Sequence, residues 1–291
     1  MLLVRGKVNF DDVGVDWLTM SELGDGEAIQ DIYTSLSNVS RETPKDGKML
    51  GYRGLTFPVE GGTVFYGMRA GAETTEHLLT VSGAGAQLIA PLWGKHGGCP
   101  TLRITRCDLQ CTVYLPEPEP KLVWGYYEAL QADPGYKRSM VGKRELTMYS
   151  SSSGDTLYIG RRGSRGSMLR IYDKGFAYGL DLGRLWRFEV EFKRERAAAM
   201  WGLVVAGGKS AVVDVVGAFC VEHGGVVLPG ERGTGVDTSA QDDGRTIKTM
   251  RWLHRCVRPV VWGLVDDGRA DEVVDALGLG WLFPQKSPPG D

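Results

Sequence analysis

The chain has 291 residues, of which 42% are hydrophobic and 24% charged, and its formal net charge is −2 at pH 7. This composition is typical of a globular protein, and the near-neutral charge argues against nonspecific coating of nucleic acid, which requires an excess of Lys and Arg. No run approaches the roughly 20 apolar residues of a membrane span, and no signal peptide is apparent. We therefore expect a cytoplasmic protein with no membrane partner.

The first part of the chain is expected to mix short strands with helices. A polar helix is predicted over residues 27–40, and two short strands over 55–59 and 63–66 are separated by Gly61-Gly62. The longest predicted strand covers 103–115. An amphipathic helix then follows a Pro-rich spacer and ends at Asp133-Pro134-Gly135.

The second part begins with strands and continues with helices. Strands are predicted over 156–160, 168–172 and 185–192, and helices over 196–205, 210–222 and 246–265. The fold class is therefore α+β, with a central antiparallel sheet flanked by helices and a helical C-terminal region. We divide the chain into a core that carries the candidate site, residues 1–205, and a helical region, residues 206–291, that packs on the core and assists DNA binding.

Three predicted strands alternate polar and apolar residues, which places the polar side chains of each strand on one face. If the strands share a sheet, one surface carries carboxylates, guanidinium groups and a tyrosine hydroxyl. Such groups suit a metal-assisted attack of tyrosine on a phosphodiester. The polar members are Arg106, Asp108 and Gln110 in the first strand, Arg170, Tyr172 and Lys174 in the second, and Arg187, Glu189, Glu191 and Lys193 in the third.

Carboxylates are the candidate metal ligands, because the four histidines never form a His-x-His pair. Mg²⁺ and Mn²⁺ prefer oxygen ligands, which Asp108 with Glu189 or Glu191 would supply. In the alternative interpretation, the two glutamates belong to an ordinary exposed strand face and pair with neighbouring cations.

Tyr172 is the candidate nucleophile among eleven tyrosines, most of which are expected to pack against the core. Its strand phase places it with Arg170 and Lys174, which would lower the cost of a phenolate and hold the scissile phosphate. Tyr178 is the second candidate and Tyr158 the third.

Two local basic patches are candidates for DNA contact, together with Arg106. The first is a loop with Arg161, Arg162 and Arg165, and the second is a helical stripe with Lys248, Arg251, Arg255 and Arg258 at spacings of three, four and three. The stripe is equally consistent with a solvated helix face.

Other motifs are excluded by their spacing. Gly207-Gly208-Lys209-Ser210 lacks the first glycine of a phosphate-binding loop, because position 203 is leucine. Ser82 to Ala86 lacks the third glycine of a dinucleotide fingerprint and is expected to form a turn. The five cysteines contain no Cys-x-x-Cys pair, so buried free thiols are expected at Cys107 and Cys111.

The order of several short segments between about residues 16 and 196 resembles the replication initiation factor family, which includes rolling-circle initiators of plasmids and phages and conjugative relaxases. These segments are Asp16-Trp17-Leu18-Thr19, Leu79 to Gly85, Thr105 to Leu109, Leu157 to Gly160, Arg170 to Lys174 and Arg187 to Glu191.

The resemblance implies a nicking and strand-transfer enzyme on a sheet related to the His-hydrophobic-His (HUH) endonuclease core, with carboxylates replacing most histidines. By position it implies Asp108 as a metal ligand, Glu189 as a second ligand and Tyr172 as the nucleophile. Family members often carry a second aspartate four residues after the first, and here that position is Thr112. This departure favours Glu191 or Gln110 as an additional ligand.

The leading hypothesis is a rolling-circle replication initiator that nicks and religates one DNA strand at an origin with Mg²⁺ or Mn²⁺. Its expected partners are an origin hairpin or single-stranded nick site and, as a further candidate, a host helicase. The same chemistry would serve a conjugative relaxase. The alternatives are a DNA-binding regulator that does not cleave and an unrelated metal hydrolase that uses Asp108 and Glu189. The sequence makes no prediction of oligomeric state.

Overall fold

The computed structural model describes most of the first 229 residues. The described residues are 2–40, 42–71, 74–133, 146–151, 154–160, 167–175, 180, 182–224 and 226–229. Contacts divide the chain into two units, 1–238 and 239–291, and all described residues belong to the first unit.

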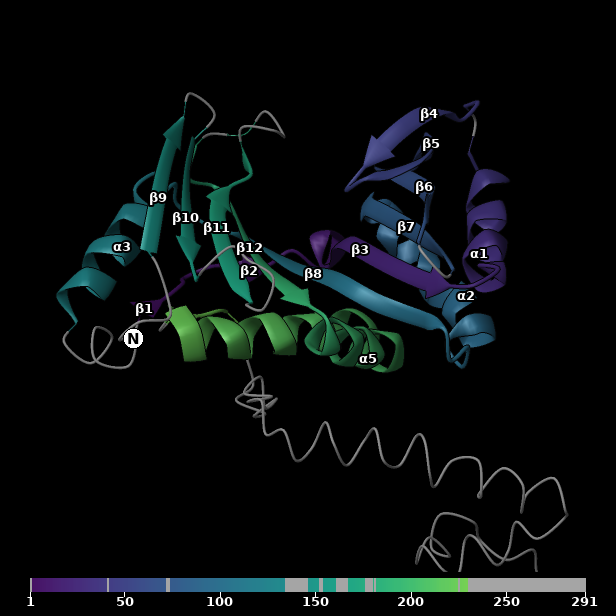
Figure 1. The fold of residues 1–291 in the computed structure, drawn as a ribbon. Helices are drawn as coiled ribbons and strands as arrows, with labels where there is room; N and C mark the ends of the chain where they lie inside the picture. Colours follow the sequence, from purple (N-terminus) through teal and green to yellow (C-terminus); the bar gives the residue numbers. More distant parts are fainter. Residues whose placement is uncertain are drawn as a thin grey trace, which may run out of the picture. The chain divides into compact units, whose positions relative to one another are not determined.

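The described residues form one large sheet, a small two-stranded sheet and several helices (Figure 1). The strands are β1 (Leu2–Leu3), β2 (Lys7–Val8), β3 (Gly14–Leu23), β4 (Lys45–Met49), β5 (Tyr52–Val59), β6 (Gly62–Ala70), β7 (Thr75–Gly83), β8 (Leu102–Tyr114), β9 (Leu146–Ser151), β10 (Gly154–Ile159), β11 (Met168–Asp173), β12 (Leu185–Lys193) and β13 (Val226–Val227). The helices are η1 (Phe10–Asp12), α1 (Glu27–Ser37), η2 (Ala84–Leu88), α2 (Ile89–His96), α3 (Leu122–Ala132), α5 (Glu195–Phe219) and η4 (Cys220–Gly224).

The large sheet has the order β4-β5-β6-β7-β3-β8-β12-β11-β10-β9, and β2 pairs with β8 beyond the start of β3. Every neighbouring pair in this sheet is antiparallel, whereas β1 and β13 pair in parallel as a separate small sheet. The predicted fold class, an antiparallel sheet flanked by helices with a helix after the last long strand, is confirmed.

The core lies between the apolar face of β8 and β12 and the helix α5, which runs along these strands in Figure 1. On β8, Cys107, Leu109 and Cys111 are fully buried on this face, and both cysteines are free thiols as predicted. Because side chains alternate along a strand, the polar residues between them face the other way. The apolar packing of the sheet on α5 therefore determines which side chains line the candidate site.

The helices predicted at 196–205 and 210–222 are parts of α5 and of the short π-helix η4 that follows it. Gly208 has φ 59° and ψ −144° and kinks α5. The helix runs without a break through position 205, the boundary expected between the core and the helical region. Lys209, next to Gly208, donates a hydrogen bond of 2.7 Å from Nζ to the carbonyl oxygen of Phe10. The Gly-Gly-Lys-Ser segment thus links the helix to the N-terminal region, consistent with its exclusion as a phosphate-binding loop.

Among the described residues, Glu195–Glu222 is long and apolar enough to cross a membrane by length and composition alone. This differs from the expectation that no segment has those properties. Its side chains Met200, Trp201, Val212 and Val216 are buried in the core, and the core helix of a globular protein meets the same criteria.

The sheet continues through strands that were not predicted. β3 and β7, near the centre of the strand order, and the helix α2 are not among the predicted elements. In the half formed by β4 to β7, Gly47, Gly54 and Gly67 are aligned across neighbouring strands. A Cβ at Gly54 would lie only 1.9 Å from the carbonyl oxygen of Tyr66, so the close approach of these strands requires glycine.

Candidate functional site

The three alternating strands are neighbours in the order β8-β12-β11, and their registers place the predicted polar residues on one face. Asp108 is the cross-strand partner of Glu191, and Gln110 is that of Glu189. On the other side of β12, Arg170 pairs with Glu189 and Tyr172 with Arg187. The predicted shared surface is therefore present.

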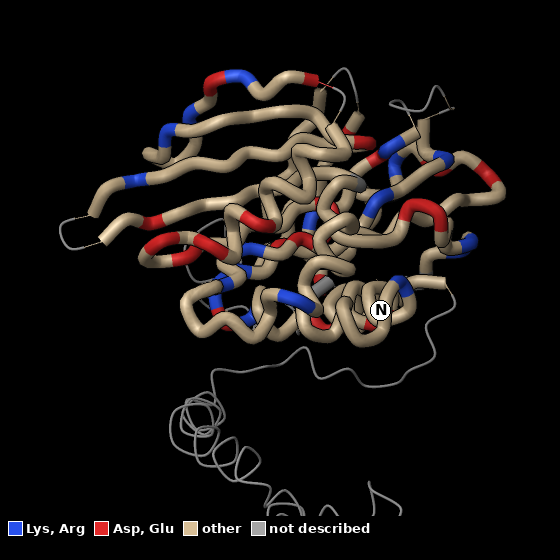
Figure 2. The backbone as a smooth tube through the Cα atoms, turned by 90° about the vertical axis from the view of Figure 1, so that its right-hand side faces the viewer, with Lys and Arg blue, Asp and Glu red and all other residues tan. Residues whose placement is uncertain are grey.

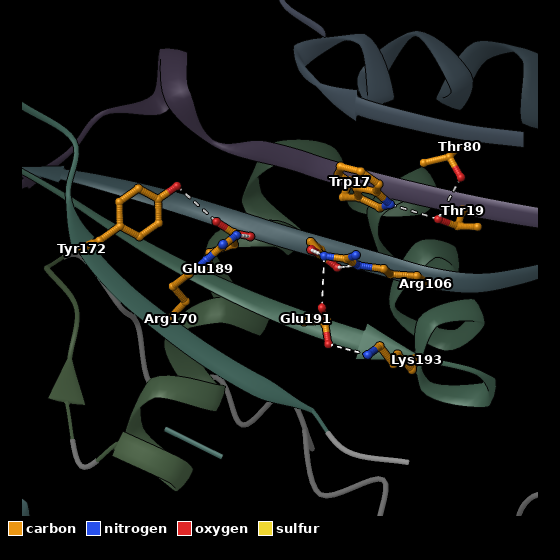
Figure 3. Close-up of polar contacts among 10 residues, drawn as sticks. Trp17, Thr19, Thr80, Arg106, Arg170, Tyr172, Glu189, Glu191 and Lys193 are labelled. Atoms are coloured by element: carbon orange, nitrogen blue, oxygen red, sulfur yellow. Dashed lines mark hydrogen bonds and ion pairs between the residues drawn. The ribbon is translucent and has the colours of Figure 1, made fainter. Parts of the chain in front are cut away.

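Ion pairs join six of these residues, which we call the carboxylate cluster (Figure 3). Arg106 holds both oxygens of Asp108, at 2.9 Å from Nε and 2.5 Å from Nη2, and it lies 3.0 Å from Glu191. The cluster comprises Arg106, Asp108, Arg170, Glu189, Glu191 and Lys193.

The carboxylates of the cluster are buried, which contradicts the alternative of an ordinary exposed strand face. Asp108, Glu189 and Glu191 are 1%, 2% and 4% exposed. Arg170 pairs with Glu189, and Lys193 lies 2.8 Å from Glu191. Burial raises the pKa of Asp108 to about 6, although Arg106 acts in the opposite direction. Charged groups persist in this buried place because each carboxylate has a cationic partner.

Tyr172 lies at the edge of the carboxylate cluster. Its hydroxyl donates a hydrogen bond of 3.2 Å to Oε2 of Glu189, and the guanidinium of Arg170 lies 5.4 Å from the ring centroid. Burial raises the pKa of Tyr172, while Arg187 and Arg170 oppose the shift. Arg170 thus lowers the pKa of Tyr172, as expected of a nearby cation. Burial raises the pKa by more, so the net effect makes the phenolate harder to form.

Arg187, which alternation predicts on this face, forms a second group of charges with two aspartates that were not predicted as site residues; we call Arg187, Asp12 and Asp16 the Arg187 cluster. Arg187 is 4% exposed and lies 2.5 Å from Asp12, which precedes β3, and 3.7 Å from Asp16 in β3. Thr112 donates to Asp12 at 2.8 Å, and Gln110 donates to it at 3.1 Å. Asp12 therefore places a carboxylate beside Thr112. Thr112 is the position at which, according to the resemblance, family members often carry a second aspartate.

Trp17 is a further residue that sequence reasoning missed, although its segment carried part of the resemblance. It is half-buried, and the guanidinium of Arg106 lies 4.8 Å from its ring centroid. Its indole Nε1 donates to Thr19 at 3.0 Å, and Thr19 lies 3.3 Å from Thr80, so a polar line extends from the carboxylate cluster across β3 to β7 (Figure 3).

A small cavity of about 10 Å³, enough for one water-sized group, lies within the carboxylate cluster. Its lining residues are Arg106, Asp108, Met168, Arg170, Glu189 and Glu191. The side-chain oxygen Oε1 of Gln110 is buried and has no hydrogen-bond partner among the described residues.

Carboxylate and amide oxygens suit Mg²⁺ or Mn²⁺, so the donor chemistry fits such an ion. Within the described part of the chain, however, no three His, Cys, Asp or Glu side chains are gathered closely enough to hold a metal. Arg106, Arg170 and Lys193 balance the carboxylates in this arrangement.

The remaining predicted residues are placed only in part. Lys174 follows β11, and burial lowers its pKa with a further contribution from Arg187. Tyr158 lies on β10, where its cross-strand partner is Arg170. The loop residues Arg161, Arg162 and Arg165, the helical stripe Lys248, Arg251, Arg255 and Arg258, and Tyr178 lie outside the described residues.

Comparison with known families identifies the segment that carries this site. Residues 102–220 match the model of the family described as replication initiation factor. The resemblance to the replication initiation factor family is confirmed. The matched segment contains β8, β11 and β12, and with them every member of the carboxylate cluster and Tyr172. No curated protein matches the chain.

A solved structure has a similar fold. It is described as a rolling circle replication initiator protein from Geobacillus stearothermophilus, and it aligns with a TM-score of 0.52 and 18% identity. The alignment covers 73% of this chain and 85% of that one. At this identity the match shows a shared fold and no more.

Proposed function

We propose that this protein is a rolling-circle replication initiator, a DNA endonuclease and strand transferase that nicks one strand at an origin by tyrosine attack and later religates it. The observation that carries the proposal is the contact of the Tyr172 hydroxyl with Glu189, beside buried carboxylates and guanidinium groups in the family-matched segment. The structural neighbour, a rolling circle replication initiator protein, supports the same role.

In the proposed reaction, the hydroxyl oxygen of Tyr172 attacks the scissile phosphorus. A phenolic O–P bond forms while the bond between phosphorus and the 3′ oxygen breaks, and the leaving 3′ oxygen takes a proton from solvent water, which leaves a free 3′ hydroxyl and a 5′ phosphotyrosine. The hydroxyl proton passes to Oε2 of Glu189, which already accepts its hydrogen bond at 3.2 Å. Arg170 and Lys174 offset the charge that develops on the phosphate. Attack by the 3′ hydroxyl reverses these steps and religates the strand.

Asp108, Glu189 and Glu191, with Gln110 as a further oxygen donor, would hold Mg²⁺ or Mn²⁺ only after these side chains leave their present ion pairs and draw closer together, because the described structure does not gather three of them into a metal site. When bound, the ion would polarise the phosphate and stabilise its negative charge. The role of the chain itself is to keep these oxygens at adjacent positions of β8 and β12. Arg106 and Arg170 would then exchange a carboxylate for a phosphate as their anionic partner.

DNA is the proposed partner, and its binding would rely on local contacts. Lys, Arg, Asp and Glu are interspersed along the described backbone rather than separated by sign (Figure 2). Arg106 would contact the strand at the site, while the loop of Arg161, Arg162 and Arg165 and the stripe of Lys248, Arg251, Arg255 and Arg258 would grip the backbone. A host helicase is a further proposed partner during strand separation.

The decisive experiment is to incubate the protein with labelled single-stranded DNA from the cognate origin and Mn²⁺, then to separate the products on a denaturing gel and map any labelled peptide. We expect a covalent adduct at Tyr172. Tyr172→Phe should form no adduct, because the ring remains but the attacking oxygen is lost. Tyr158→Phe, which alters a tyrosine whose cross-strand partner is Arg170, should form the adduct normally.

An adduct that persists in Tyr172→Phe and disappears in Tyr178→Phe would show that the nucleophile assignment is wrong. Tight origin binding without any cleavage would favour the DNA-binding regulator, a role consistent with carboxylates that are neutralised by Arg106, Arg170 and Lys193. Turnover of small phosphoesters without an adduct would favour the metal hydrolase. A relaxase would give the same adduct on a transfer-origin strand.

A further inference from the structure

We propose that Trp17 is a stacking contact for an unpaired DNA base next to the scissile phosphate. The inference rests on the proposed function and names a binding residue that contacts the substrate beside the carboxylate cluster. Single-stranded nucleic acid is commonly held by aromatic side chains on which bases stack, next to cations that hold the backbone. Trp17 and Arg106 together provide both kinds of group.

The position of Trp17 follows from an irregularity in β3. The β3–β8 register shifts between Val15 and Trp17, so Asp16 is an extra residue in the strand. In a regular strand, two consecutive side chains would point to opposite faces. Here Asp16 approaches Arg187 and Trp17 lies beside Arg106, so both reach the face of the candidate site. The bulge thus adds a second aromatic ring, besides Tyr172, to a surface otherwise built mainly from charged groups.

The ring is suited to stacking because its one polar atom already has a partner. Indole Nε1 donates to Thr19, whose hydroxyl lies close to that of Thr80 (Figure 3). The Arg106 guanidinium lies over one face of the half-buried ring, so we place the base on the other face, where stacking is independent of hydrogen-bonding pattern. This arrangement predicts affinity for an unpaired base with weak preference for its identity.

The register locates the base relative to the reaction. Trp17 is the cross-strand partner of Asp108, so the ring adjoins the carboxylate cluster at the position next to a proposed metal ligand. Arg106 contacts both the ring and Asp108. A DNA strand whose scissile phosphate lies at the cluster would therefore place one base on the Trp17 ring. That base would be within one or two nucleotides of the nick.

The test is a coupling measurement between the side chain and the base. Binding of a labelled single-stranded origin oligonucleotide that spans the nick is measured by fluorescence anisotropy in EDTA, for the full chain and for variants. A set of oligonucleotides, each with one abasic position, is measured in parallel. We expect Trp17→Leu to raise Kd by roughly 10- to 100-fold on intact DNA. One abasic position near the nick should raise the wild-type Kd similarly and have no further effect on the variant.

Two variants separate stacking from a loss of folding. Trp17→Phe keeps an aromatic ring and should recover most of the affinity. Trp124→Leu is the matched control, because Trp124 is 37% exposed and its Nε1 also donates to one side chain, Asp155. Asp155 precedes Thr156, the cross-strand partner of Tyr172, so it points to the opposite face of the sheet. This control should bind intact DNA like the wild type.

The rate of adduct formation over a range of DNA concentrations gives a second readout. Trp17→Leu should raise KM while leaving kcat within about twofold, because the ring holds the substrate and does not react. The inference would be overturned by an unchanged Kd in Trp17→Leu. It would also be overturned if every abasic position raised the Kd of Trp17→Leu by the same factor as it raised the Kd of the wild type. Since binding is measured in EDTA, absence of nicking in the wild type would contradict the proposed function without affecting this result.

Discussion

Asp108 is a carboxyl group in the middle of the sheet with almost no access to water. Its bidentate partner Arg106 favours the charged form, and its burial favours the neutral form. Burial has the larger effect, because removing a carboxylate from water costs more than one ion pair returns. At the scale of the residue, the site therefore holds charge at the expense of stability, as expected where carboxylates serve binding or catalysis.

This balance predicts a pH dependence of folding. The pKa of Asp108 is raised to about 6 in the folded chain, above that of an unfolded aspartate, so the folded state binds more protons between about pH 4 and pH 6. The free energy of unfolding should consequently fall as pH rises through this range, with a slope of at most about 1.4 kcal/mol per pH unit from this group.

Urea unfolding in EDTA at several pH values, compared between the wild type and Asp108→Asn, measures this contribution. The variant should lose that part of the slope and be more stable relative to the wild type at pH 7 than at pH 4. Asp46→Asn, which changes an exposed aspartate of β4, is the control and should retain the wild-type slope. Equal slopes in all three proteins would contradict the assigned effect of burial.

At the scale of the element, α5 shows how a local backbone conformation shapes a long helix. The helix buries one apolar stripe on each side of Gly208, and the kink allows both stripes to pack in the core. The φ of 59° at Gly208 is a conformation that residues with a Cβ adopt only at a cost. Among the described residues, no neighbouring atom lies within 4 Å of a Cβ built there, so the expected cost comes from the backbone conformation.

We expect Gly208→Ala to lower the free energy of unfolding by about 1 kcal/mol. Gly202→Ala is the matched control, because Gly202 is exposed, lies in the regular part of α5 and also has no atom near its Cβ position. This second change should stabilise the protein by roughly 0.5 to 1 kcal/mol. Denaturant unfolding of both variants checks the difference in sign, and two changes of the same sign would argue against the kink.

At the scale of the whole molecule, the candidate face is completed by residues that are far apart in the sequence. Asp12 reaches Arg187, Gln110 and Thr112 from the N-terminal helix η1, across separations of 98 to 175 residues. The helix η1 is also joined to α5 through Lys209. The N-terminal segment thus neutralises a buried guanidinium of the sheet and belongs to the structure of the site.

Asp12→Asn should therefore destabilise the protein by about 2 kcal/mol, because the change leaves the charge of Arg187 with only the more distant Asp16. Asp11→Asn removes a charge from the neighbouring exposed residue and should change stability by less than about 0.5 kcal/mol. Thermal and urea unfolding of the two variants provides the measurement. A similar loss in both would indicate a general charge effect.

Several parts of this arrangement could be read from the sequence. Period-two alternation correctly placed Asp108, Tyr172 and Glu189 on one face, because adjacent side chains of a strand must point in opposite directions. Helix α1, the turn at Gly61-Gly62 and the free buried cysteines were also predicted from local patterns. The family resemblance required only the order of short segments, and the match over residues 102–220 confirmed it.

Only the tertiary structure decides which ion-pair and hydrogen-bond partners the polar side chains of this face have. Alternation gives the face of a side chain, but the degree of burial, and hence the shifted pKa of Asp108 and Tyr172, depends on what covers that face. The sequence by itself determined the chemical groups and their common surface. Asp12 and Trp17 joined that surface, and Arg187 acquired its acidic partners, only through long-range contacts and a bulge in β3, because neither of these leaves a periodic signal in the local sequence.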